Sequence, residues 1–564
     1  MDSNLKVALI IFGIIAAVMF FFYISAKQQK EMNRIRIKNS WGKIPEREYE
    51  YEEFECISHY FKHKLEADSS IPYIDDITWN DMDMDSIFCM MNQTYSSAGQ
   101  EYLYYMLRTP VTDQEVLDQR EKLIRYYTEH AAERVKMQTV FSDIGRSRKI
   151  SIIDYISRLE GVKQESNGRH YLLLAAYVIS LLLMMFHTGI GITALFISIV
   201  FGISTYFNRK REIEPYIITF VYILKLLKAA DTVSKVKIAE FDSYTDRIKK
   251  AKSVFLKFKA GAVFLTSNAA AGGDIMDALL DYIRILFHVD LIKFNMMSQE
   301  LNRHQKEIEE ILDNIGILEA AAAVASFREY LPFYTVPVLK KQKNVYMNLK
   351  NVYHPMIAEP VANSIEEDRG VLITGSNASG KSTFLKTAGI NAILAQSVNT
   401  CPATEYEACF FQIYSSMALS DNLQGKESYY IVEIKSLKRI INHRNDEIPV
   451  LCFVDEVLRG TNTIERIAAS AQILKSLAKE QVLCFAATHD IELTYVLKDV
   501  YSNYHFQEDI KENDILFNYQ LQKGRATSRN AIRLLGIIGY DHEIIKKADQ
   551  TAAHFMETGE WALS

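Results

Sequence analysis

Three uncharged apolar segments dominate the hydrophobic pattern of the first half of the chain. The first covers residues 7–24, and the other two, 171–186 and 190–207, are separated by a turn of three residues. At a rise of 1.5 Å per residue, helices of this length nearly span a hydrocarbon core of about 30 Å. The pattern predicts three transmembrane helices, an N-terminal anchor at 1–26 and a tight hairpin at 171–207.

Most of the basic residues that flank these segments lie on one side: only Lys6 precedes the first segment, whereas several Lys and Arg residues follow it. Positive charge in the flanks of a membrane helix marks its cytoplasmic end. The turn at 187–189 carries no Lys or Arg, so both outer ends of the hairpin are expected in the cytoplasm. We therefore expect a multi-pass protein of the cell membrane. The flanking basic residues are Lys27, Lys30, Arg34, Arg36, Lys38, Arg169, Arg209, Lys210 and Arg211.

Two alternatives to this membrane assignment remain at this stage. The first segment could be a signal peptide, although it lacks a strongly basic leader and a small-x-small cleavage site. The hairpin could be a buried helical pair in a soluble core, since each half is short for a membrane span. An apolar character around the whole circumference argues against that second alternative, because soluble surface helices show only an apolar stripe.

Around the apolar segments, the pattern divides the chain into four parts. We expect a solvated juxtamembrane linker with some helix at 27–70, and an all-α region with long, arm-like helices at 71–340 that contains the hairpin. At 341–564, short apolar runs such as VLIT, VLCFVD and VLCFAA alternate with helical patterns. This alternation is typical of an α/β domain with a mainly parallel sheet, and it is followed by a C-terminal helical region.

Composition and charge exclude several classes of protein. With 49% hydrophobic residues the chain is not a disordered one, and its net charge of -6 provides no global attraction to nucleic acid or acidic lipid. A local basic excess at 225–259 could meet the phosphates of DNA or of lipid, or could be a solvated helix face. The six cysteines form no CxxC pair, which predicts neither a zinc site nor a disulfide framework.

The strongest chemical motif is GSNASGKS at 375–382. It fits the P-loop pattern GxxxxGK[ST], follows the apolar run VLIT and opens a helical segment. Glycines let backbone N–H groups surround phosphates, Lys381 can reach the β- and γ-phosphates, and Ser382 can offer its hydroxyl to Mg²⁺. A nucleoside triphosphate is the expected ligand. The expected contact residues are Gly375, Ser376, Asn377, Ala378, Ser379, Gly380, Lys381, Ser382 and Thr383.

Two further apolar runs end in residues suited to hydrolysis. VLCFVD ends in Asp455, which can hold the magnesium shell, and the next residue, Glu456, can orient or deprotonate water. VLCFAA leads to His489, which can sense the γ-phosphate because ligands of open α/β sheets bind at the carboxyl ends of the strands. A structural carboxylate pair and a structural histidine are the alternatives.

Three of these motifs resemble the MutS family in order and spacing. ITGSNASGKST, VDEVLRGTNT and ATHDIEL are similar to that family's TGPNMGGKST, MDEIGRGTST and ATHYFEL. The resemblance implies an ABC/MutS-like P-loop ATPase that uses ATP and Mg²⁺. It extends to NVYHPMI at 351–357 and to the C-terminal region, and weaker similarity at 78–127 concerns the family's core helical domain. The family's N-terminal mismatch-reading domain has no counterpart here.

The same resemblance implies an assembly. DNLQGKESYYIVEI at 421–434 is similar to the family's signature stretch, DDLASGRSTFMVEM, which approaches the nucleotide of a partner subunit. Ser428 falls on the signature serine, so a homodimer through the ATPase domains is expected, and DNA binding is implied by resemblance alone. The sequence thus predicts a membrane-anchored, MutS-like ATPase, and the resemblance implies that it acts on DNA. The alternative is a membrane ATPase that acts on a protein partner or on its own hairpin without nucleic acid.

Overall fold

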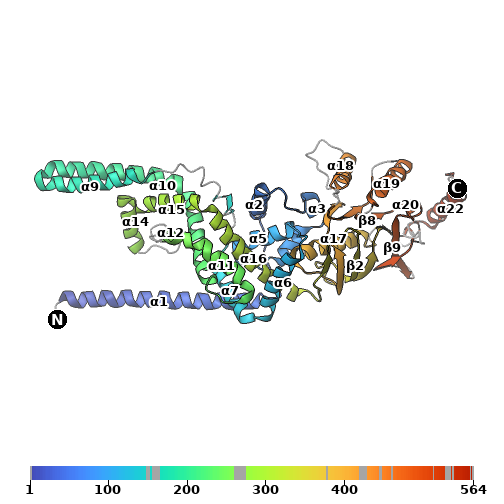
Figure 1. Cartoon of the computed structure of the whole chain (residues 1–564), viewed down its shortest axis with the longest axis horizontal. Coiled ribbons are helices and arrows are strands. Elements are labelled where there is room, and N and C mark those ends of the chain that lie inside the picture. The colour runs from blue at the N-terminus through green and yellow to red at the C-terminus, as the bar shows by residue number, and fades with distance from the viewer. Residues whose placement is uncertain are drawn as a thin grey trace. The chain divides into compact units, whose positions relative to one another are not determined.

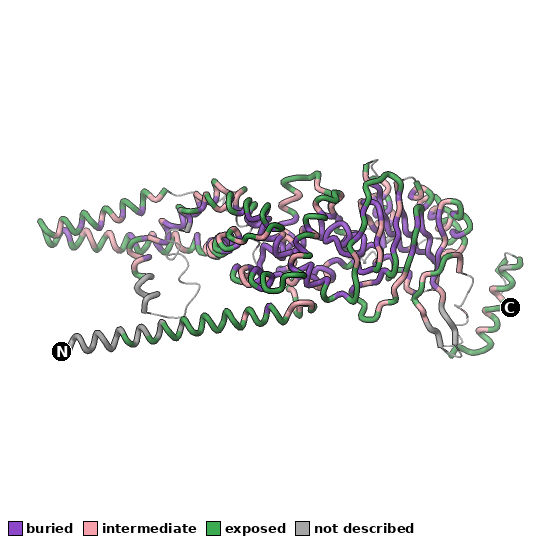
Figure 2. Tube along the Cα trace, turned by 60° about the horizontal axis from the view of Figure 1, so that its bottom comes forward, coloured by how far each residue is buried: buried purple, intermediate pink, exposed green. Residues whose placement is uncertain are grey.

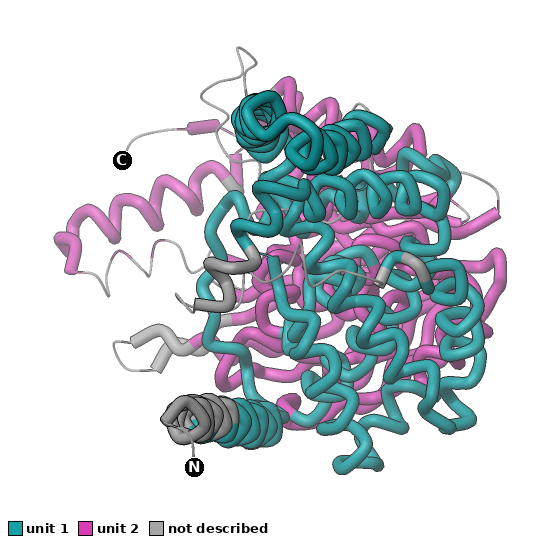
Figure 3. Tube along the Cα trace, turned by 90° about the vertical axis from the view of Figure 1, so that its left-hand side faces the viewer, with its two compact units in different colours: residues 1–70, 91–105, 122–329 teal, residues 71–90, 106–121, 330–564 magenta. Residues whose placement is uncertain are grey.

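The chain forms two compact units, which Figure 3 shows in different colours. One unit contains residues 1–70, 91–105 and 122–329, and is called the helical unit below; the other contains residues 71–90, 106–121 and 330–564, and is called the sheet unit. This computed structural model describes residues 3–147, 151, 153–154, 156, 166–259, 275–376, 379–417, 429–443, 447–458, 462–479, 481–511, 514–526, 532, 535, 539–558 and 560–561.

The helical unit consists of long helices, as the sequence predicts (Figure 1). Two helices, α5 and α6, begin in one unit and end in the other. The described helices of this part are α1 (Ser3–Asn39), α2 (Tyr51–Ala67), α5 (Ser97–Arg108), α6 (Gln114–Glu129), α7 (Ala131–Ile144), α9 (Gly168–Phe186), α10 (Thr188–Val233), α11 (Asp242–Lys252), α12 (Leu256–Lys259), α14 (Ile275–Phe287), α15 (Val289–Arg303) and α16 (Gln305–Tyr330), with short 3₁₀ turns η1 (Ala239–Phe241) and η2 (Ser253–Phe255).

Helices α9 and α10 form the predicted hairpin, joined at His187. Only 22% of the apolar stretch of α9 and 17% of that of α10 is buried, so the pair is not the core of a soluble fold (Figure 2). Gly191 and Gly202 allow the two helices to approach closely: a Cβ on Gly202 would lie 2.4 Å from the Tyr177 hydroxyl. Beyond the hairpin, α10 continues without a break into the body of the helical unit.

The structure differs from the expectation of three membrane helices. Among the described residues only α9 and α10 are long and apolar enough to cross a membrane. The third expected span, at 7–24, is helical as part of α1, but most of its side chains lie outside the described ones, so it stays a prediction.

The segment expected as a solvated linker, 27–70, is mostly helical. Helix α1 continues to Asn39, and α2 occupies 51–67. Ile57, Tyr60 and Phe61 of α2 are buried, because their spacing places them on one face of the helix. The helix expected within this segment is thus present, and one face of α2 packs into the helical unit.

The sheet unit contains the predicted parallel sheet and a second sheet that the sequence did not predict. The larger sheet has the order β10-β9-β4-β8-β7-β6, in which only β10 pairs antiparallel. The smaller sheet, β1-β5-β2-β3, mixes parallel and antiparallel pairs. The strands are β1 (Val338–Lys340), β2 (Met347–Val352), β3 (Asn363–Glu367), β4 (Gly370–Thr374), β5 (Glu405–Cys409), β6 (Gln412–Ser416), β7 (Val450–Asp455), β8 (Val482–Thr488), β9 (Tyr501–Lys511) and β10 (Asp514–Lys523).

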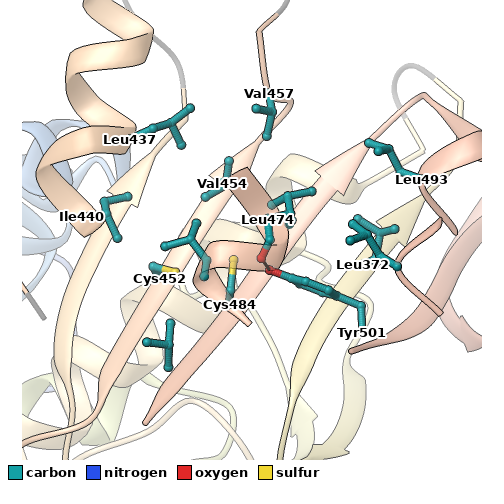
Figure 4. Close-up of a cluster of buried hydrophobic side chains, with 14 of the residues drawn as sticks. Leu372, Leu437, Ile440, Cys452, Val454, Val457, Leu474, Cys484, Leu493 and Tyr501 are labelled. Carbon is teal, nitrogen blue, oxygen red and sulfur yellow. Dashed lines mark hydrogen bonds between the residues drawn. The ribbon is translucent and has the colours of Figure 1, made fainter. Parts of the chain in front are cut away.

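Helices cover the larger sheet and bury its central strands. All residues of β4, β7 and β8 are buried, which explains why these strands read as continuous apolar runs. Figure 4 shows part of this core, where Cys452 of β7 lies next to Cys484 of β8 and near Leu474 and Tyr501. The helices of this unit include α3 (Asp76–Asp81), α4 (Met84–Met91), α17 (Lys381–Val398), α18 (Tyr429–Asn442), α19 (Thr463–Leu477), α20 (Ile491–Val496) and α22 (His542–Thr558).

The sheet unit includes two helical segments, 71–90 and 106–121, that the sequence assigned to the helical region. Buried polar contacts hold the first of these segments against strand β6. The Asp81 carboxylate at the end of α3 accepts from the Ser415 hydroxyl (2.6 Å) and the Met417 backbone N–H (3.0 Å) at the end of β6. Burial raises the pKa of Asp81, and these two hydrogen bonds counteract that effect.

We expect Asp81→Ala to destabilise the sheet unit by about 2–4 kcal/mol, because it leaves two buried donors without their acceptor. Asp81→Asn is the matched control, since both donors use the same carboxylate oxygen, Oδ2, and an amide oxygen can accept from both. The measurement is the denaturant midpoint of unfolding for each variant. Equal midpoints for wild type and Asp81→Ala would contradict the role of this contact.

Candidate active site

The predicted P-loop connects β4 with the N-terminus of α17, at the carboxyl edge of the parallel sheet. Two glycines have backbone conformations that other residues rarely adopt: Gly375 has φ +155° and Gly380 has φ +108°. A Cβ on Gly375 would also lie 2.9 Å from the Phe506 carbonyl oxygen. The loop can therefore keep its backbone N–H groups close to a ligand only with glycine at these positions.

Lys381 begins α17 and is buried at the centre of the loop. Its ammonium donates to the carbonyl oxygens of Gly375 (2.8 Å) and Ser376 (2.7 Å). A buried ammonium beside a helix N-terminus provides a site of concentrated positive potential. The loop is thus equipped to bind a phosphate chain.

Ser382 and Asp455 lie next to each other, as the sequence predicts for a magnesium site. The Ser382 hydroxyl donates to Asp455 Oδ2 at 2.6 Å, although 73 positions separate the two residues in the chain. Mg²⁺ keeps several waters and needs only one or two protein oxygens besides phosphate oxygens. This donor set therefore fits Mg²⁺, which when bound would neutralise phosphate charge. Among the described residues, no cluster of three or more Asp, Glu, His or Cys side chains offers a metal site.

Glu456 and His489 also come together. His489 Nε2 lies 2.9 Å from Glu456 Oε1, although the residues follow different strands, β7 and β8. Glu456 has a left-handed backbone conformation (φ +59°), which costs a non-glycine residue about 1–2 kcal/mol. The strained turn aims the carboxylate at the P-loop cavity, where a general base for water would have to lie.

A neighbouring ion pair holds the segment that follows His489. Asp490 accepts two hydrogen bonds from the guanidinium of Arg466, at 3.0 and 2.6 Å. This bidentate contact joins α19 to the end of β8 and raises the pKa of Arg466. The sequence analysis missed Arg466, because no motif marks a residue whose role depends on contact with another strand end.

The P-loop opens into a cavity of about 660 Å³. Residues of β2, of the loop after it, and of β3, β9 and β10 also line the cavity, and the sequence analysis did not assign them to the site. The one signal in the sequence was NVYHPMI, which contains His354 and Ile357. Burial lowers the pKa of His354, and the positive charge of Lys386 lowers it further. Both effects favour the neutral imidazole. Beyond the P-loop, Glu456 and His489, the lining residues are Val352, His354, Ile357, Glu359, Pro360, Val361, Asn363, Phe384, Thr387, Phe506 and Tyr519.

The structure places some of the remaining predicted site residues at the cavity, whereas others lie outside the described residues. Ser379 and Thr383 line the same cavity as Lys381. Asn377, Ala378 and Ser428 lie outside the described residues, so their assignments stay predictions.

Comparisons with known proteins agree with this geometry. Residues 371–556 match the family model of MutS domain V. The chain is 28% identical over 265 residues to the DNA mismatch repair protein MutS of Thermotoga maritima, a match that covers 45% of this chain and 33% of the relative. It is 28% identical over 248 residues to MutS of Thermus thermophilus, covering 43% and 29%.

A third relative, the DNA mismatch repair protein MutS of Pseudothermotoga lettingae, is 30% identical over 253 residues, with 43% of this chain and 30% of the relative covered. The chain thus spans about a third of the length of the curated relatives that it matches. The similarity concerns its C-terminal part.

Proposed function

We propose that this chain, which belongs to the MutS family through its C-terminal domain, binds and hydrolyses ATP at the P-loop cavity. The observation that carries the proposal is the convergence of three strand ends. The P-loop after β4, the Asp455–Glu456 pair after β7 and His489 after β8 all meet at the carboxyl edge of one parallel sheet. Ligands of open α/β sheets bind at this edge.

Each residue has a distinct role in the proposed reaction. Lys381 and the backbone N–H groups of the P-loop bind the phosphates, while Ser382 and Asp455 hold Mg²⁺. Glu456 orients or deprotonates the attacking water, and His489, in contact with Glu456, senses the γ-phosphate. Apolar and aromatic residues in the cavity lining, among them Ile357, Val361 and Phe506, are suited to the nucleoside.

DNA and a second copy of the chain are the proposed partners. The names of the relatives state DNA mismatch repair, which supports DNA as a ligand of this chain. The resemblance of 421–434 to the signature stretch supports a homodimer in which Ser428 approaches the partner's nucleotide. The basic segment 225–259 offers local positive charge for a phosphate backbone.

The test uses the full chain purified in detergent. Phosphate release from Mg·ATP is measured alone and with homoduplex, mismatched, branched and single-stranded DNA. We expect hydrolysis in every case, stimulation by at least one DNA, and DNA affinity that falls log-linearly with salt at about -0.9 per neutralised phosphate. Absence of hydrolysis under all conditions would refute the ATPase.

A second function is favoured by helix α10. Because this one helix runs from the hairpin into the body of the helical unit, it can transmit movement between them. If ATP hydrolysis neither responds to DNA nor accompanies DNA binding, the ATPase acts on a protein partner or on its own hairpin.

We further propose that the hairpin crosses the cell membrane, with the sheet unit in the cytoplasm. Most apolar side chains of α9 and of the first half of α10 are exposed, and a hydrocarbon core is the environment in which such exposure is stable. Glycine at 191 and 202 allows the close helix contact that is common in membranes. The segment 7–24 supplies a further anchor.

Cysteine labelling in intact cells tests this topology. We expect a membrane-impermeant maleimide to label Thr188→Cys, in the turn, but not Lys27→Cys or Arg211→Cys. The six native cysteines lie outside all three apolar segments and on the proposed cytoplasmic side, so wild type should remain unlabelled. Permeabilised cells are the control, in which Lys27→Cys and Arg211→Cys should react. Protection of Thr188→Cys in intact cells would show that the hairpin does not span the membrane.

A further inference from the structure

The turn that carries Glu456 contains two strained residues. Glu456 has φ +59° and Leu458 has φ +62°, and neither is glycine. The related motif MDEIGRGTST has glycine where this chain has Leu458, a position at which glycine would adopt the same conformation without strain. In this chain, other contacts must hold the turn 456–458 in place.

Three hydrogen bonds from three different elements hold this turn. The Glu456 N–H donates to the Ala487 carbonyl oxygen of β8 at 2.9 Å, and the Ser470 hydroxyl of α19 donates to the Val457 carbonyl oxygen at 3.1 Å. The third bond runs from the Leu458 N–H to the Glu433 carboxylate of α18. It is the only one of the three that uses an ionisable side chain.

Buried side chains reinforce the same turn. Val457 and Leu458 belong to the hydrophobic cluster between the sheet and its helices, together with Leu437 and Ile440 of α18. Figure 4 shows Val457, Leu437 and Ile440 of this cluster. Helix α18 therefore packs against the core. This packing directs Glu433, which is only 4% exposed, toward the turn.

Helix α18 is also tied to the neighbouring strand. The Arg439 guanidinium donates to the Ser415 carbonyl oxygen at the end of β6 (2.6 Å) and lies 2.7 Å from the Asp75 carboxylate. These contacts leave α18 little freedom to rotate. The helix begins at Tyr429, immediately after Ser428. The Glu433 carboxylate and the packing of Val457 and Leu458 against α18 therefore connect the turn that carries Glu456 to the helix that follows the expected signature segment.

We propose that Glu433 is a positioning residue for hydrolysis: its carboxylate holds the Leu458 N–H and thereby keeps Glu456 in the strained conformation that faces His489 and the P-loop cavity. Glu433 does not line that cavity among the described residues, so it acts through Glu456 and not on the nucleotide. The inference rests on the proposed ATPase function and adds to it a residue required for catalysis but not for binding.

The test compares four variants of the full chain in detergent. Glu433→Ala removes the acceptor, Glu433→Gln keeps an acceptor oxygen at the same reach, and Glu433→Asp keeps the charge but shortens the reach. Lys438→Ala, at an exposed position of the same helix, is the matched control. For each, kcat and KM for ATP hydrolysis, ATP affinity and Tm are measured.

We expect kcat to fall about tenfold or more in Glu433→Ala and Glu433→Asp, the effect of one lost buried hydrogen bond on the reacting geometry. KM and ATP affinity should stay within about threefold, and Glu433→Gln and Lys438→Ala should behave like wild type. If Glu433→Ala does not fold, the comparison of Glu433→Gln with Glu433→Asp decides the matter.

The inference is overturned if Glu433→Ala has the kcat of wild type, or if Glu433→Gln is impaired while Glu433→Asp is active, which would indicate a need for charge and not for an acceptor. A wild-type protein that does not hydrolyse ATP would instead refute the proposed function itself. The two failures are therefore distinguishable.

Discussion

Lys381→Ala is expected to abolish ATP binding, with a loss of affinity on the order of 100-fold or more. The ammonium is the one buried cation of the P-loop, and the backbone N–H groups alone cannot balance the charge of the terminal phosphates. The measurement is the dissociation constant of Mg·ATP, obtained by calorimetry on the detergent-solubilised chain.

Lys386→Ala is the matched control for this variant. It removes a lysine from the same helix, one turn further along, and Lys386 does not line the cavity. Its ATP affinity should stay within about threefold of wild type, since a charge that does not contact the ligand contributes little in water. Undiminished affinity in Lys381→Ala would remove the basis of the nucleotide site.

Glu456→Gln is expected to lower kcat by about 100-fold or more while ATP remains bound, because a positioned general base contributes about 10²–10⁴-fold. The amide keeps the shape of the side chain and leaves Ser382 and Asp455 unchanged. Glu465→Gln, at an exposed position of α19, is the control and should hydrolyse ATP at the rate of wild type. Equal kcat for wild type and Glu456→Gln would assign the base to another residue.

The same variant tests the proposed dimer. If Ser428 contacts the partner's γ-phosphate, ATP supplies interface contacts that ADP lacks, and trapped ATP should favour the dimer. The measurement is the mass of Glu456→Gln in detergent with ATP and with ADP, and with Ser428→Arg added to block the contact. A mass and a crosslinking pattern that are the same in all three samples would refute closure through Ser428.

The buried strands of the larger sheet were the part of the fold that could be predicted most directly. β4, β7 and β8 are buried on both faces, so each reads as an uninterrupted apolar run, and the polar residues that follow each run lie at the carboxyl edge of the sheet. For this reason the contacts between Ser382 and Asp455, and between Glu456 and His489, follow from the order of strands and motifs.

The smaller sheet was missed for the opposite reason. In β3 only Ile365 is apolar, and the buried position Glu367 is a carboxylate. In β5 partly buried and buried residues alternate over most of the strand, so neither strand forms an apolar run. The part of the cavity lining that lies beyond the P-loop was missed with it, because the loop after β2 and strand β10 meet only in the folded chain.

By itself, the sequence determined which local elements form and which of their ends carry charge. Uninterrupted apolar runs set the helices of the hairpin and the buried strands, and the glycines of the P-loop set a conformation that needs no distant partner. Those properties depend on residues close together in the chain, so they can be recognised from the sequence.

Only the tertiary structure decided which distant residues share a hydrogen bond. The contact of Asp81 with Ser415 places an N-terminal helix in the sheet unit, and the contact of Glu433 with Leu458 holds the turn beside Glu456. Neither contact leaves a pattern in the sequence, because one Asp or Glu reads the same there whether its side chain is exposed, has a structural role or positions another residue. The role of the carboxylate depends on the buried donor that contacts it in the folded chain.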